Sequence, residues 1–106
     1  MARLIWTEPA LQDLNEIAEY IALDNIDAAR KLVKKIFSMA ERLADFPDSG
    51  RRPPELKRTQ YREKIVGPCR IFYRVHKNSI YILYIMRSER ELRKHLMEER
   101  KKFKGH

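Results

Sequence analysis

The chain has 106 residues, a length that suits one folded domain with a hydrophobic core of its own. Its 23 lysines and arginines outnumber its 15 acidic residues, and its single cysteine excludes an intramolecular disulfide. No apolar run approaches the roughly 20 residues that a membrane-spanning helix needs, so we expect a cytoplasmic protein without a membrane segment.

The positive charge lies in the second half of the chain. Residues 1–50 contain six Lys/Arg and nine Asp/Glu, a net charge of −3, whereas residues 51–106 contain seventeen and six, a net charge of +11. Such segregation is typical of a surface that meets an anionic partner, either nucleic acid or an acidic protein segment. The alternative is that the basic half serves solubility alone.

A strand and a helix are predicted at the beginning of the chain. Leu4-Ile5-Trp6 is a short apolar run, Thr7 is a candidate N-cap, and Pro9 suits the first turn of a helix. Apolar residues then recur at three- and four-residue steps to about Leu23. The acidic residues in this stretch are predicted on the outer face of the helix: Asp13, Glu16 and Glu19.

A second helix and a loop follow. Asp24-Asn25 is a turn and cap signal, after which helical spacing continues to about Phe46. Because the link between the helices is so short, they are predicted to form an antiparallel hairpin. Residues 47–54 contain three prolines and Gly50, a composition that predicts a loop.

Three consecutive strands are predicted next, at residues 61–66, 69–75 and 80–86. Their connections are the turn residues Gly67-Pro68 and the segment 76–79, so the strands should form an antiparallel meander. The last run is apolar on both faces. We therefore expect it to be central and covered on both sides, by the helical hairpin and by either the C-terminus or a partner.

The C-terminal segment is predicted to be a basic helix. Ser88-x-x-Glu91 has the spacing of a capping box, which places the start of the helix there. Its apolar stripe is sparse, comprising Leu92, Leu96 and Phe103, so we expect it to dock loosely, to fray after about Met97, or to order on a partner. The chain is thus predicted to be one domain, 1–106, with a core of residues 1–87 and a basic helix or tail at 88–106.

The predicted fold class is α+β: an N-terminal strand, an antiparallel helical hairpin packed on a small, mainly antiparallel sheet in the order β-α-α-β-β-β, and a C-terminal helix. With this order the chain resembles the ParE/RelE family of bacterial type II toxins, and it is closest to the ParE-like, plasmid-stabilisation branch. The resemblance covers nearly the whole chain. It is carried by the segments 5–7, 14–21, 46–51, 61–63, 69–73 and 86–88.

The resemblance implies one of two targets. RelE-like members cut mRNA on the ribosome, whereas ParE-like members poison DNA gyrase, and an antitoxin holds both inactive. Arg70 and Arg87 match the arginines that RelE-like enzymes use on and after the last strands, and Glu63 is the only acid in the sheet that could act as a base. RelE-like enzymes generally place a Tyr or His soon after the last strand, where this chain has residues 89–93 with neither.

Each of these residues also has a structural interpretation. Arg70 could pair with Glu63 across adjacent strands, and Arg87 could be a surface charge. The spacing of His, Cys, Asp and Glu predicts no metal site, and no cofactor motif is present. The residues predicted to contact the target or nucleic acid are Arg62, Lys64, Arg74, Arg90, Arg93 and Lys94.

We expect a toxin that binds and poisons DNA gyrase without catalysing a reaction and that a cognate acidic antitoxin neutralises. The alternative is a metal-independent, ribosome-dependent mRNA endoribonuclease of the RelE kind. A second alternative is a weakly toxic plasmid-maintenance protein that acts mainly through its antitoxin. A homodimer or a toxin–antitoxin hetero-oligomer is compatible with each.

Overall fold

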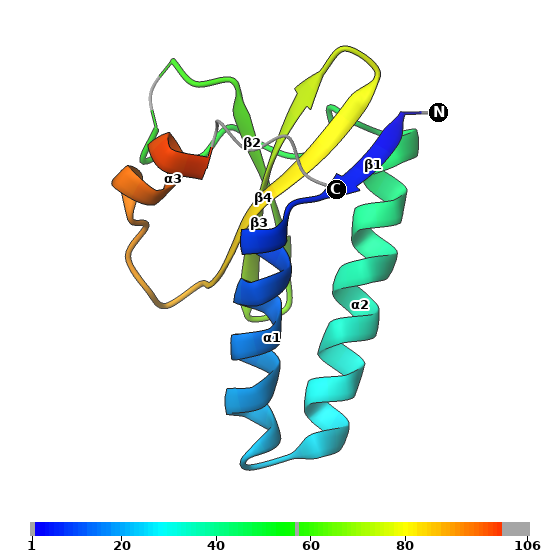
Figure 1. The fold of residues 1–106 in the computed structure, drawn as a ribbon, viewed down its shortest axis with the longest axis vertical. Helices are drawn as coiled ribbons and strands as arrows, with labels where there is room; N and C mark the ends of the chain where they lie inside the picture. The colour runs from blue at the N-terminus through cyan, green and yellow to red at the C-terminus, as the bar shows by residue number, and fades with distance from the viewer. Residues whose placement is uncertain (1, 57, 101–106) are drawn as a thin grey trace.

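A computed structural model describes residues 2–56 and 58–100 and confirms the α+β class with the predicted order of elements. An N-terminal strand precedes two helices, three strands and a third helix (Figure 1). The elements are β1 (Arg3–Trp6), α1 (Glu8–Ala22), α2 (Ile26–Asp45), β2 (Tyr61–Val66), β3 (Cys69–His76), β4 (Ser79–Arg87) and α3 (Lys94–Arg100). None of the helices in the described ranges is long and apolar enough to cross a membrane.

The four strands form one sheet in the order β1-β4-β3-β2. β2, β3 and β4 pair as the predicted antiparallel meander, whereas β1 runs parallel to β4. β4 is therefore central, as its apolar sequence on both faces predicts. A register shift at Phe72/Tyr73 marks an irregularity between β3 and β4.

The helical hairpin covers one face of the sheet. α1 and α2 lie side by side and project beyond the strands (Figure 1). Both predicted helix starts are confirmed, because the Thr7 side chain accepts a hydrogen bond from the Ala10 N–H and Asn25 accepts one from the Ala28 N–H. Buried residues of both helices and of the sheet form this core: Ala10, Leu14, Leu32, Ile36, Ala40, Leu43, Val66, Cys69, Ile71, Tyr73, Ile80, Ile82 and Ile85.

A second, smaller core lies on the opposite face of the sheet. There Met97 of α3 is 1% exposed and packs against strand residues. α3 is thus the cover that the doubly apolar β4 requires. The buried members of this core are Tyr61, Phe72, Leu83, Tyr84, Met86 and Met97.

The predicted start of the C-terminal helix is wrong, because α3 begins at Lys94 rather than directly after Ser88. The Ser88 N–H donates to the Pro68 carbonyl at 2.7 Å, and the Arg90 N–H donates to the Arg87 carbonyl at 3.1 Å. These bonds hold the segment after β4 in a turn against the β2–β3 connection. The helix also continues past Met97 to Arg100, and Phe103 lies outside the described residues.

Asp13 does not lie on an outer polar face of α1 as predicted. Its carboxylate accepts a hydrogen bond from the Ile85 N–H at 3.0 Å and pairs with Arg100 of α3 at 2.5 Å. Burial raises the pKa of Asp13, although Arg100 acts in the opposite direction. This side chain joins α1, β4 and α3.

Candidate functional site

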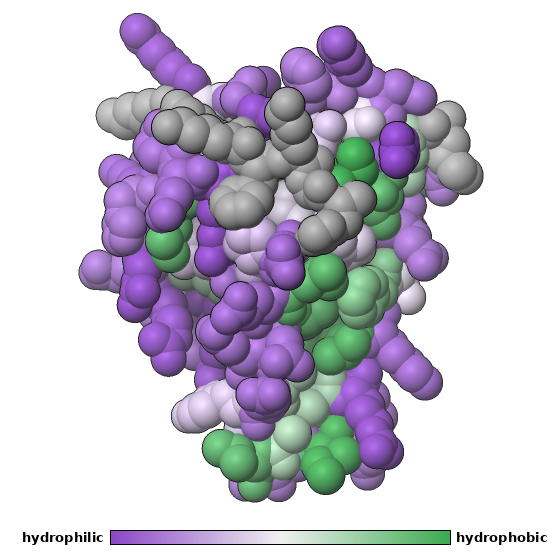
Figure 2. Space-filling model, viewed as in Figure 1, coloured by the Kyte–Doolittle hydropathy of each residue, from purple (hydrophilic) through white to green (hydrophobic). Residues whose placement is uncertain are grey.

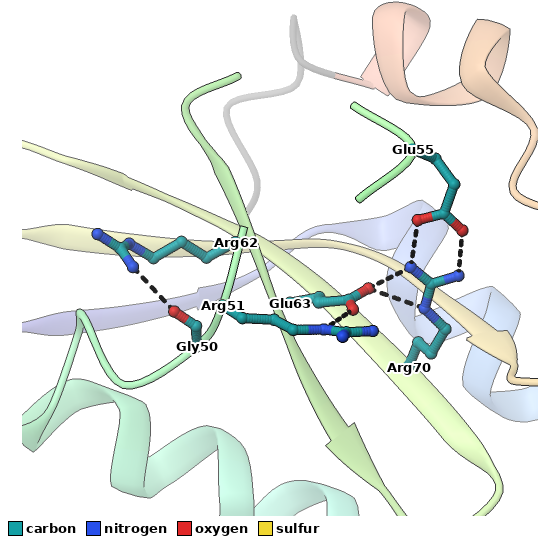
Figure 3. A network of polar contacts seen from close by, with 6 residues as sticks. All are labelled: Gly50, Arg51, Glu55, Arg62, Glu63 and Arg70. Carbon is teal, nitrogen blue, oxygen red and sulfur yellow. Dashed lines mark hydrogen bonds and ion pairs between the residues drawn. The ribbon is translucent and has the colours of Figure 1, made fainter. Parts of the chain in front are cut away.

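Two arginines and two glutamates form a charged network on the face of the sheet that α3 also covers (Figure 3). Glu63 of β2 lies at its centre, with Arg51 Nε 2.5 Å from Oε1 and Arg70 Nε 2.8 Å from Oε2. Arg70 also donates hydrogen bonds to both carboxylate oxygens of Glu55, at 2.6 and 2.8 Å. The pairing of Arg70 with Glu63 considered from the sequence is therefore present, and Glu55 extends it.

The main chain holds this network in place. Arg51 and Glu63 exchange two backbone hydrogen bonds, of 3.0 and 2.8 Å, so the loop that contains Arg51 pairs with the outer edge of β2. The Glu63 side chain is completely buried. A buried carboxylate is stable only when it is paired, and here both oxygens have an arginine partner.

The electrostatics of the network fix its charge states. Hydrogen bonding to Arg70 lowers the pKa of Glu55 from 4.5 to about 2, although burial opposes this effect. The same hydrogen bond raises the pKa of the Arg70 guanidinium still further. Both side chains are therefore charged throughout the physiological pH range.

Arg87 lies on the other face of the sheet from Arg70. In the register of β3 and β4, Arg87 is opposite Cys69 and Arg70 is opposite Met86, and successive strand residues point to opposite faces. The Arg87 guanidinium lies 5.0 Å from the centre of the Tyr20 ring on α1, and its Nε is 2.7 Å from Glu89. The structure does not bring the two arginines together.

The basic residues predicted as a phosphate-binding row are divided as well. Arg62 and Lys64 lie on the hairpin face and contact carbonyls of the loop, including Gly50 at 2.8 Å and Ser49 at 3.5 Å. Arg74 lies on the opposite face, with its guanidinium 5.8 Å from the Tyr81 ring. These three side chains do not form a continuous row.

A groove of about 690 Å³ lies between α1 and the segment that leads into α3. Arg90 and Arg93 line it together with Arg87, Tyr20 and Tyr84. Lys94, the first residue of α3, is exposed but does not line the groove. Two of the three predicted C-terminal contact residues thus share one concave surface.

A second groove, of about 710 Å³, lies on the helical hairpin and has a more apolar lining. Ile26 at its end is 55% exposed, and neighbouring Leu23 is 86% exposed. Figure 2 shows the corresponding apolar surface at the lower end of the molecule, over the turn between α1 and α2. The residues that line the groove are Ala18, Glu19, Ala22, Ile26, Asp27, Ala29, Arg30, Lys31, Val33 and Lys34.

Sequence reasoning missed four residues that organise these surfaces: Arg51, Glu55, Asp13 and Arg100. Their partners are 12 to 87 positions away in the chain, and Arg51 and Glu55 lie on a loop without periodicity, so no local pattern could identify them. Among the described residues, no group of three or more His, Cys, Asp or Glu side chains could hold a metal ion. The arrangement offers paired charges, aromatic rings and grooves that suit recognition of another molecule.

Comparison with known proteins gives consistent results. Residues 4–92 match the family described as ParE toxin of type II toxin-antitoxin system, parDE. The chain is 37% identical over 91 residues to a protein of Sinorhizobium fredii that carries the provisional name of toxin Y4kP, covering 84% of this chain and 91% of the relative. It is 32% identical over 91 residues to Toxin RelE2 of Caulobacter vibrioides, covering 85% of this chain and 99% of that protein.

A solved structure has the same fold. The chain described as the chromosomal ParDE TA system from P. aeruginosa superposes with a TM-score of 0.70 at 29% identity, covering 84% of this chain and 98% of the other. The family match extends from β1 to the segment before α3. This range includes the charged network, and it includes Arg70 and Arg87, the two arginines that the sequence analysis selected. The chain therefore belongs to the ParE toxin family of type II toxin–antitoxin systems.

Proposed function

We propose that this toxin acts by binding DNA gyrase and trapping it on cleaved DNA, without catalysing a reaction of its own. The observation that carries the proposal is the placement of Arg70 and Arg87 on opposite faces of the sheet. Cleavage of RNA requires cationic groups that converge on one phosphate and a base within hydrogen-bond reach of the attacking 2′-hydroxyl.

The candidate base supports the same conclusion. Glu63 is the acid expected to accept a proton in the nuclease alternative, but its side chain is completely buried and both carboxylate oxygens contact arginines. A general base must lie within hydrogen-bond reach of the hydroxyl that it deprotonates, and a carboxylate that is enclosed in the fold and bonded to two guanidinium groups has no oxygen open to a substrate. The aromatic rings and arginines around the α1 groove instead suit a protein interface.

The gyrase proposal is tested by incubating the purified chain with gyrase, ATP and supercoiled plasmid, beside a translating-ribosome mRNA cleavage assay. Accumulation of linear plasmid after detergent and protease treatment, with intact mRNA, is the expected result. The Arg70→Ala/Arg87→Ala double variant should leave the mRNA intact as the wild type does. Codon-phased mRNA cuts that this variant abolishes, with unaffected plasmid, would reject the proposal and favour the endoribonuclease.

We further propose that a cognate acidic antitoxin neutralises the toxin by laying an amphipathic segment in the hairpin groove. The groove has an apolar floor that includes Ala22, Ala29 and Val33. Its charged lining has three cationic residues and two acidic ones: Arg30, Lys31, Lys34, Glu19 and Asp27. An acidic segment with one apolar face would bury this floor and pair with the cations.

Two exposed apolar residues provide a matched test of the antitoxin proposal. Ile26 in the groove and Phe46 after α2 are 55% and 62% exposed, so a charge at either position should disturb the isolated fold to a similar, small extent. We expect Ile26→Glu to weaken antitoxin binding at least about tenfold, equal to about 1.4 kcal/mol, and Phe46→Glu to leave it unchanged. Equal losses in calorimetric titrations of both variants would contradict this location.

A further inference from the structure

Arg70 holds two carboxylates that differ in their access to solvent. The Glu63 side chain is completely buried, whereas the Glu55 side chain is 34% exposed. The Arg70 guanidinium uses Nε and Nη2 for Glu63 and uses Nη1 and Nη2 for Glu55 (Figure 3). One partner is therefore enclosed in the fold, and the other reaches the arginine from outside.

Glu55 is not needed for the pairing of the strands. It belongs to the segment between α2 and β2. The next residue, Leu56, donates its N–H to the Pro53 carbonyl at 3.1 Å, a hydrogen bond within this same segment. If the Glu55 side chain moved away, Arg70 would keep both bonds to Glu63, and β2 would keep its register with β3. Exchange of this one carboxylate is thus compatible with an intact sheet.

The position that Glu55 occupies nevertheless suits an oxyanion. The Arg70 side chain is only 8% exposed and its guanidinium lies 4.9 Å from the centre of the Phe72 ring, so water can reach it only from the outer side. A buried guanidinium with unpaired N–H groups is unfavourable, and a planar carboxylate satisfies two of them at once. Without Glu55, the group of Arg51, Arg70 and Glu63 has a net charge of +1, which one carboxylate neutralises.

We propose that the outer side of the Arg70 guanidinium is a recognition site for a carboxylate of a protein partner and that Glu55 occupies this site in the free toxin. That the partner is a protein follows from the proposed function, and the proposal rests on it in this respect. An acidic side chain of that partner displaces Glu55 and forms the same two hydrogen bonds. Glu55 thereby selects against simple anions, because a tethered carboxylate has an effective concentration on the order of millimolar or above.

The exchange is tested on the full-length chain with two small monoanions, acetate and dimethyl phosphate. The readout is the Arg70 Nε–H resonance in ¹⁵N-labelled protein, which reports directly on the guanidinium. We expect Glu55→Ala to respond saturably to acetate at a concentration at least tenfold lower than the wild type does. Glu55→Gln, which keeps the size of the side chain, should show an intermediate response.

Two control variants separate this site from other changes. Glu89→Ala removes a carboxylate that pairs with Arg87 on the other face, and it should leave the acetate response of Arg70 unchanged. Adding Arg70→Lys to Glu55→Ala should abolish the saturable binding, because an ammonium group does not form the bidentate contact. In this double variant the binding of acetate is measured by calorimetry, because lysine has no Nε–H resonance of the arginine kind.

Three results would overturn the proposal. They are equal acetate responses in the wild type and Glu55→Ala, no response of Arg70 in either, and tighter binding of dimethyl phosphate than of acetate by Glu55→Ala. The last result would assign the site to a nucleic-acid phosphodiester. None of these measurements uses gyrase or antitoxin, so their outcome is independent of the gyrase assay.

Discussion

Gly50 lies at a point where the loop has no room for a side chain. Its N–H donates to the Tyr73 hydroxyl at 2.9 Å, and that hydroxyl donates to the Pro47 carbonyl at 2.7 Å. A Cβ at this position would lie 2.5 Å from the Tyr73 hydroxyl and 2.7 Å from the Glu63 carbonyl. The close approach of the loop to the sheet thus depends on glycine here and positions Arg51 beside Glu63.

Gly50→Ala should therefore destabilise the protein by about 1–3 kcal/mol, because either the loop or the Tyr73 ring must move. Gln60→Ala, at an exposed position later in the same loop, is the control and should change the free energy of unfolding by less than about 0.5 kcal/mol. Urea unfolding measures both. A Gly50→Ala variant as stable as the wild type would show that the loop relaxes without loss.

The contribution of Glu55 to stability should depend on pH. Its pKa of about 2 in the folded chain lies below the ordinary 4.5, so the stabilisation is complete above the ordinary value and is lost as the pH falls towards 2. The difference in unfolding free energy between the wild type and Glu55→Gln should accordingly shrink from pH 6 to pH 2. Urea titrations across this range test it, and a difference that stays constant would contradict the ion pair.

Local periodicity was sufficient to predict the hairpin and the three-stranded meander, because apolar spacing and turn residues act over short distances. The start of α3 could not be predicted in this way. The capping box at Ser88 competes with a hydrogen bond to the Pro68 carbonyl, which lies twenty residues earlier in the chain. The pairing of Arg70 with Glu63 followed from adjacent strands, whereas Glu55 comes from a loop whose path the sequence does not specify.

α3 should contribute to stability although it is short. Met97 is 1% exposed within the second core, so Met97→Ala should cost about 2–5 kcal/mol, whereas Met97→Leu, which keeps the volume, should cost less than about 1.5 kcal/mol. Chemical denaturation followed by circular dichroism gives both values. If Met97→Ala unfolds at the wild-type denaturant concentration, α3 is only loosely attached to the sheet.

At the scale of the whole molecule, the charge separation should steer association with an acidic antitoxin. The net charge of +11 in residues 51–106 acts over distances that salt screens, whereas buried apolar contacts are insensitive to salt. We expect the association rate to fall as salt rises to about 0.5 M, about five times the concentration at which the Debye length is 10 Å, while binding stays nanomolar. Stopped-flow mixing measures the rate, and a rate independent of salt would contradict this prediction.

Two sets of basic residues can be compared in the same experiment. Neutralising Arg90, Arg93 and Lys94 before and in α3 should reduce the salt dependence of the association rate. Neutralising Arg30, Lys31 and Lys34 on α2 removes the same charge from the hairpin groove. If only the second set matters, the hairpin groove is the surface that the antitoxin meets first.

The pairing of Arg51 with β2 also bears on how this chain can associate with itself. An outermost strand with open N–H and C=O groups is a template on which a second copy can add its own strand. In β2 the outward backbone groups of Glu63 already bond to Arg51, and the N–H of Tyr61 bonds to the Thr59 hydroxyl. The loop thus covers this part of the β2 edge against the addition of another strand, and we expect a homodimer to form through a different surface.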